Sequence, residues 1–132
     1  MMKKTIYYFP LVLTCLLVNA QHYYKDILVT QTANQRHQLN RQNKVKSIKF
    51  VSFDADSKPI EGFKSEQNFS RDFQQVTTTT STTLTGTTLS TSWFNSKDQL
   101  VKTLDTSDGV KTITTYSYNS NNQLTTIFNT TT

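Results

Sequence analysis

Few residue types in this chain could carry out chemistry. The two histidines, His22 and His37, lie fifteen residues apart, and the single cysteine is Cys15. A zinc site would need both histidines and two carboxylates, because no thiolate ligand follows residue 20. The chain also lacks the Gly-Xaa-Ser-Xaa-Gly turn that presents a catalytic serine. We therefore predict no metal site, no cofactor and no enzymatic activity.

The acidic residues are typical of turns. Asp54 and Asp56 alternate as at the start of a calcium loop, but the glycine and terminal glutamate of such a loop are missing. Glu61 and Glu66 are the only glutamates, and no catalytic acid pair stands out.

The aromatic residues near the C-terminus offer a binding hypothesis. Trp93, Tyr116 and Tyr118 fall on predicted strands, and neighbours such as Trp93 and Phe94 must point to opposite faces of a sheet. One reading is an exposed platform of Trp93 and a tyrosine that stacks on a sugar ring. The other is that Trp93 fills the core of a small domain.

Basic residues are concentrated in residues 27–53, which hold no acid. They fit either a solvated strand edge, where lysine discourages pairing, or contact with an anionic glycan or lipid headgroup. Nucleic acid is not an expected partner, because the protein is predicted to be exported. The residues are Arg36, Arg41, Lys44, Lys46 and Lys49.

Residues 1–20 are typical of a secretory signal peptide. A basic start precedes an apolar run at residues 6–18, and small residues lead to a cleavage site between Ala20 and Gln21. This pattern predicts a secreted, periplasmic or cell-surface protein, consistent with a bacterial envelope.

Lipidation at Cys15 is not expected, because Thr14 is a poor fit before a lipidated cysteine. Loss of Lys3 and Lys4 with the signal lowers the formal net charge from +5 to +3. No later stretch is long and apolar enough to cross a membrane.

The rest of the chain divides at about residue 44. Residues 21–43 predict a strand around residues 27–29 and then a short helix or coil over residues 32–43. Residues 44–132 predict an all-β domain, an antiparallel meander of about seven to eight strands joined by short polar turns. The predicted strands are residues 45–53, 60–69, 73–84, 87–94, 100–106, 110–118 and 124–128.

Two features refine this domain. Gly86 and the Asp108-Gly109 pair predict tight hairpins. The threonine-rich residues 77–92 fit either a disordered stalk or strands. We favour strands, because threonine is β-branched, proline is absent and hydroxyls can pair across strands.

A turn motif occurs at residues 53–59, 94–100 and 118–124. Each copy opens with an aromatic residue, places Asp or Asn second, and carries Ser, Asp or Asn fifth. The second residue is expected to bond back to the backbone, and the fifth to take a positive φ. These turn positions are Asp54, Ser57, Asn95, Asp98, Asn119 and Asn122.

The motif resembles the YD repeat of Rhs-type proteins, which runs Tyr-Asp, two variable residues, Gly, one residue, Leu. Tyr118, Asn119, Asn122 and Leu124 occupy those places, with asparagine replacing both Asp and Gly. The resemblance covers about residues 44–128. It implies a strip of β-hairpins of the kind that forms shells or glycan-binding surfaces.

The sequence thus predicts an exported β-repeat protein with a structural or surface-binding role, its partner a glycan or another envelope protein. One alternative is a small up-and-down barrel that holds an apolar ligand. Another is a piece of a larger YD-repeat protein. An open sheet edge after residue 128 would be a site of self-association.

Overall fold

The structure, a computed structural model, describes the backbone of residues 8–132 and the side chains from Tyr24 onward. The chain divides into two compact units, Met1–Ala33 and Asn34–Thr132. The predicted basic start, Lys3 and Lys4, lies outside the described residues, as do the side chains around the predicted cleavage site. Within the described residues, no helix has both the length and the apolar character needed to cross a bilayer.

A single helix, α1 (Tyr8–Gln42), replaces the predicted strand around residues 27–29. That strand prediction is wrong, and Thr32 does not begin a helix. The hydroxyls of Thr30 and Thr32 donate to the carbonyls of Asp26 and Leu28, four residues earlier in the helix. Ile27 and Val29, the β-branched residues of the predicted strand, lie inside this helix, because propensity is only a weak guide to local structure.

A residue in the left-handed conformation follows the end of the helix. Lys44 has a φ of 52°, and the amide of Val45 donates to the carbonyl of Asn40 at 2.9 Å. A left-handed residue just past the last turn is a common way to satisfy the final carbonyls.

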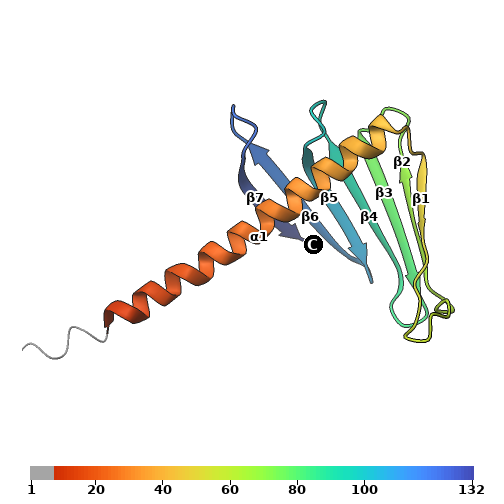
Figure 1. Ribbon diagram of the computed structural model, residues 1–132, viewed down its shortest axis with the longest axis horizontal. Helices are drawn as coiled ribbons and strands as arrows, with labels where there is room; N and C mark the ends of the chain where they lie inside the picture. The colour runs from red at the N-terminus through yellow and green to blue at the C-terminus, as the bar shows by residue number, and fades with distance from the viewer. Residues whose placement is uncertain (1–7) are drawn as a thin grey trace, which may run out of the picture. The chain divides into compact units, whose positions relative to one another are not determined.

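Seven antiparallel strands follow in chain order and form one sheet, so the predicted all-β meander is confirmed (Figure 1). The strand order runs from β1 to β7 without closure, and a closed barrel is therefore wrong for the described residues. The strands are β1 (Ser47–Phe50), β2 (Lys64–Phe69), β3 (Gln75–Thr82), β4 (Gly86–Phe94), β5 (Leu100–Ser107), β6 (Val110–Tyr118) and β7 (Leu124–Thr131).

The hairpin predictions are confirmed at the level of the backbone. Asp108 and Gly109 both have positive φ, 49° and 81°, as a tight primed turn requires, and Gly86 has a φ of 67°. The threonine-rich segment forms β3 and β4. Its expected hydroxyl pairs occur, with 3.0 Å between the side-chain oxygens of Ser65 and Thr80.

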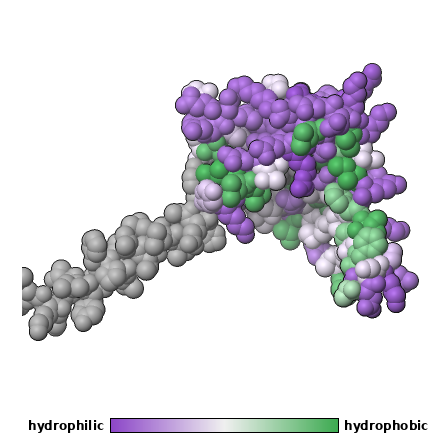
Figure 2. All heavy atoms as spheres, in the orientation of Figure 1, coloured by the Kyte–Doolittle hydropathy of each residue, from purple (hydrophilic) through white to green (hydrophobic). Residues whose placement is uncertain are grey.

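Little apolar surface is buried in the sheet. The buried apolar residues among those described are Val76, Phe94 and Leu100. Figure 2 shows a mostly hydrophilic surface on which apolar residues form separate patches. With so few buried apolar residues, hydrogen bonds and ion pairs between side chains also hold the end of the sheet in place.

Candidate functional site

The motif turns share one hydrogen-bond pattern. In each, the second residue's side-chain oxygen accepts from the amides two and four residues later. Asp54 accepts from Asp56 and Lys58 at 2.9 and 2.8 Å. Asn95 and Asn119 repeat this arrangement at 2.9 to 3.0 Å. The repeat is therefore a repeat of turn geometry as well as of residue type.

The fifth residue of every motif has a positive φ, as predicted. The angles are 61° at Ser57, 60° at Asp98 and 61° at Asn122. Asparagine and aspartate reach this region at lower cost than most residues.

A further copy was missed in the sequence. Residues 69–75 run from the last residue of β2 to the first of β3, and Phe73 has a φ of 58°. The amide of Ser70 donates to the carbonyl of Gln75, and the Ser70 hydroxyl accepts from the Gln75 amide, both at 2.9 Å. The return bond reaches one residue further than in the other turns. This turn, and those at residues 95–98 and 119–122, follow alternate strands, so all three lie at the same end of the meander.

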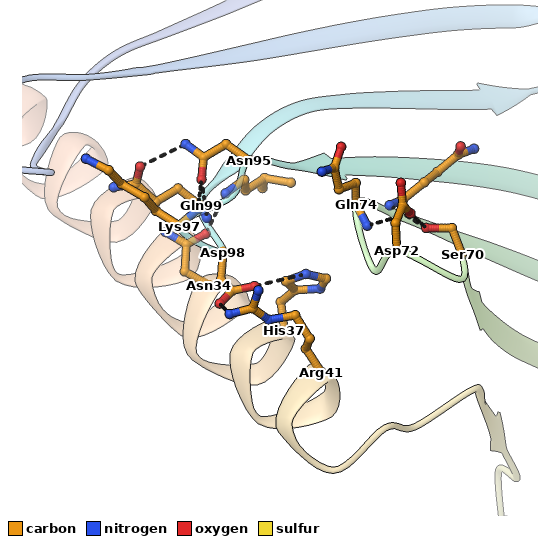
Figure 3. A network of polar contacts seen from close by, with 12 residues as sticks. Asn34, His37, Arg41, Ser70, Asp72, Gln74, Asn95, Lys97, Asp98 and Gln99 are labelled. Carbon is orange, nitrogen blue, oxygen red and sulfur yellow. Dashed lines mark hydrogen bonds and ion pairs between the residues drawn. The ribbon is translucent and has the colours of Figure 1, made fainter.

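The last turns of α1, from Asn34 on, belong to the same compact unit as the sheet. Asn34, His37 and Arg41 follow helical spacing and contact the motif turn at residues 95–98 and strand β5 (Figure 3). Leu39, the large apolar residue of this part of the helix, is 57% exposed. The side chains through which the helix contacts the sheet are therefore polar.

Asp98 is the centre of this contact and is only 5% exposed. Nη2 of Arg41 lies 2.6 Å from its Oδ2, and Nε2 of His37 lies 3.5 Å from its Oδ1. The first contact is a strong charge-assisted hydrogen bond, whereas the second is too long for a well-formed one. Figure 3 shows Asp98 held between the two helix side chains.

Burial lowers the pKa of His37, although the Asp98 carboxylate acts in the opposite direction. Both ring nitrogens are buried without a hydrogen-bond partner among the described residues. The ring instead packs on Phe94. His37 is therefore a neutral, packed imidazole at neutral pH.

A pocket of about 510 Å³ lies between the segment that connects α1 to β1 and the β2–β3 turn. Three basic residues line it, all exposed and without an ion-pair partner among the described residues. Two phenylalanine rings, 6.1 Å apart, form its apolar part. The lining residues are Lys44, Lys46, Phe69, Ser70, Arg71 and Phe73.

Phe73, which lines the pocket, has a strained backbone conformation. A positive φ is a clear outlier for a bulky residue, and it costs about 1–2 kcal/mol. Such strain is frequently found at functional sites, where surrounding contacts maintain it. The neighbouring Asp72 accepts from Ser70 and Gln74, and these hydrogen bonds lower its pKa.

Lys44 and Lys46 are thus brought together with Arg71, whose role was not predicted. Arg41 lies in the contact with Asp98 instead, and Arg36 is exposed on α1. A second pocket, of about 480 Å³, is lined by Lys49 and Lys64 and also by Glu66, whose negative charge offsets part of their positive charge.

The structure does not bring the three aromatic candidates together. Trp93 pairs with Lys102, which pairs with Thr115, so Tyr116 and Tyr118 point to the other face of the sheet. Nζ of Lys102 lies 5.0 Å from the centroid of the Trp93 ring and covers a face on which a sugar would stack. Tyr118 instead donates from its hydroxyl to the carbonyl of Leu100 at 2.8 Å.

In the part of the chain that the structure describes, no three His, Cys, Asp or Glu side chains gather as a metal ion would require. Comparison of the chain with protein-family models, with curated proteins and with solved structures finds no match.

Proposed function

We propose that this chain is an exported, non-enzymatic β-hairpin repeat protein that binds an anionic glycan. The site is the pocket between the α1–β1 connection and the β2–β3 turn. The observation that carries the proposal is the gathering of Lys44, Lys46 and Arg71, without ion-pair partners among the described residues, around two phenylalanine rings.

The chemistry of the pocket fits a sugar that carries carboxylate or sulfate groups. Arg71 can bind a carboxylate through two parallel hydrogen bonds, and the two lysines add positive charge. Phe69 and Phe73 supply the apolar surface on which the C–H face of a sugar ring packs. A binding role also gives a reason for the strained φ of Phe73.

The repeated turns support the proposal that this protein is related to the YD-repeat family. Its turns share one geometry, and the meander they connect is the architecture that the resemblance implies. In this proposal the sheet is a scaffold and the turns carry the site.

Binding is tested by calorimetric titration with a uronic-acid oligosaccharide, a sulfated oligosaccharide and a neutral oligosaccharide. We expect the acidic sugars to bind and the neutral one not to bind. Lys46→Gln with Arg71→Gln should weaken binding about tenfold or more, because each removes a charge-assisted contact. The matched control, Lys58→Gln with Lys111→Gln, removes two exposed lysines outside the pocket and should leave affinity unchanged.

The variant Phe73→Asn tests the aromatic surface of the pocket without changing the fold of the turn. Asparagine tolerates a positive φ, so the turn should be retained while the aromatic surface is lost. Binding to anionic lipid vesicles but to no oligosaccharide would contradict the proposal.

Export is tested independently. A C-terminally tagged chain should appear outside the cytoplasm, and mass spectrometry should place its first residue at Gln21. A chain that stays uncleaved in the cytoplasm would contradict export.

A further inference from the structure

The two edges of the sheet differ in how they are protected. Edge strand β1 has four residues, includes Lys49 and continues into an irregular segment that contains Pro59. Edge strand β7 has eight residues, LTTIFNTT, with no charge, proline or glycine. Short length and lysine are the usual protection against edge pairing, and β7 has neither.

The hydrogen-bond register defines which backbone groups β7 presents outward. Lys111 and Thr132 exchange both of their backbone bonds at 2.9 Å, so they form a hydrogen-bonded pair. Hydrogen-bonded pairs recur every second residue, and Phe128 therefore turns its amide and carbonyl toward its partner on β6, Thr115. It follows that Ile127, Asn129 and Thr131 direct their amides and carbonyls away from the sheet.

We propose that β7 pairs with β7 of a second copy of this chain, antiparallel and about a twofold axis at Phe128. In this register Ile127 faces Asn129 of the second copy, and the outward backbone groups of both residues are satisfied. Phe128 then faces its own counterpart in a pair without backbone hydrogen bonds, where side chains approach most closely.

The side chain of Phe128 is suited to this position. It is 63% exposed and lies at the middle of the strand. Two phenylalanines directly opposite one another in an antiparallel pair are mutually stabilising. Because the interface is self-complementary, it closes at two copies.

Sedimentation equilibrium of the full chain should therefore show a concentration-dependent dimer. Asn129→Pro removes an outward amide without removing a bond to β6, and it should raise the dimer dissociation constant about tenfold or more. Asn129→Lys should do the same by placing like charges on the edge. Asn121→Lys, in an exposed turn, adds the same charge elsewhere and should have no effect.

The register is tested by cross-linking in a Cys15→Ser background, where the new thiol is the only one. Phe128→Cys places two thiols directly opposite one another at a Cα separation of about 4.5 Å, within disulfide range. Ile127→Cys places each thiol opposite Asn129 and should cross-link far less.

Three results would overturn the proposal. They are a chain that stays monomeric at all concentrations, a dimer that persists in both Asn129 variants, and equal cross-linking at positions 127 and 128. Circular dichroism on each variant establishes that the sheet is retained. If Asn129→Pro unfolds the chain, the Asn129→Lys and cross-linking results decide.

Discussion

The imidazole of His37 lies flat on the ring of Phe94, with centroids 3.7 Å apart and an angle of 4° between the planes. This stack joins the last part of α1 to the end of β4 and places a titratable group in the small buried core. Protonation would put a charge there, close to Arg41, and burial disfavours that charge more strongly than the Asp98 carboxylate favours it.

We therefore expect the stability of the fold to depend on the pH through His37. Its pKa is lowered on folding from the ordinary value of 6.5, so the unfolded chain binds more protons in the interval between the two values. The contribution of neutral His37 to the unfolding free energy is fully present above about pH 6.5, and it is lost as the pH falls through the pKa of His37 in the folded protein. Urea unfolding across this interval measures the effect.

The control is His37→Phe, which keeps a ring on Phe94 and removes the titration. Its pH dependence should be flatter, and His22, present in both proteins, cancels in the comparison. An identical pH dependence in both proteins would contradict the assignment.

The pair of Arg41 and Asp98 should contribute measurably to stability. Removing one partner of a buried pair leaves an uncompensated charge, although the Arg41 side chain is 45% exposed and water offsets part of the loss. Arg41→Gln should cost about 2 kcal/mol of unfolding free energy. Arg36→Gln, on the exposed side of the same helix, should change it by less than about 0.5 kcal/mol. Equal losses would show that the pair is not responsible.

The turns separate what local sequence could predict from what it could not. Positive φ at Ser57, Asp98 and Asn122 follows from residue type at a fixed place in a short motif, and it was predicted. The copy at residues 69–75 was missed because Phe73 stands where Asn, Asp or Ser was expected and the turn is one residue longer.

The helix contact was missed for a different reason. Sequence patterns reveal a packed helix face through apolar residues, and here Asn34, His37 and Arg41 make the contact. Their helical spacing was a usable signal, but its partner, Asp98, lies 57 residues from Arg41 in the chain. Only the fold brings the two together, and the same holds for the pocket that joins Lys44 and Lys46 to Arg71.

Glycine substitutions at two turn positions should have opposite effects. Ser57 and Asp98 have almost the same φ, and glycine relieves the cost of that conformation at both. Ser57→Gly, in an exposed turn, should stabilise the fold by about 0.5–1 kcal/mol. Asp98→Gly removes the partner of Arg41 and should destabilise it by about 2 kcal/mol or more. Thermal unfolding compares the two, and a stabilising Asp98→Gly would refute a structural role for this carboxylate.

The turn at Asn95 should be more sensitive than its equivalent at Asn119. Each side-chain oxygen accepts two backbone amides, but Asn95 is half-buried and Asn119 is exposed, so water can replace only the second set fully. Asn95→Ala should cost about 1–3 kcal/mol and Asn119→Ala less than about 1 kcal/mol. Asp at either position preserves the acceptor and should recover most of the loss. Equal costs for the two alanine variants would contradict the role of burial.

The hydroxyl of Tyr118 connects three elements and should be needed for their positions. It donates to the carbonyl of Leu100 at 2.8 Å and accepts from Nδ2 of Asn34 at 3.4 Å, while Oδ1 of Asn34 accepts from the Leu100 amide at 2.8 Å. Tyr118→Phe keeps the ring but leaves the Leu100 carbonyl and the Asn34 amide unpaired, at a cost of about 1–2 kcal/mol. Asn34→Ala breaks the same set of bonds from the helix side. The double variant should therefore cost less than the sum of the two single variants, because residues in one hydrogen-bond network are not additive. Strict additivity in urea unfolding would mean that the two side chains act independently, and would contradict a connected contact between α1, β5 and β6.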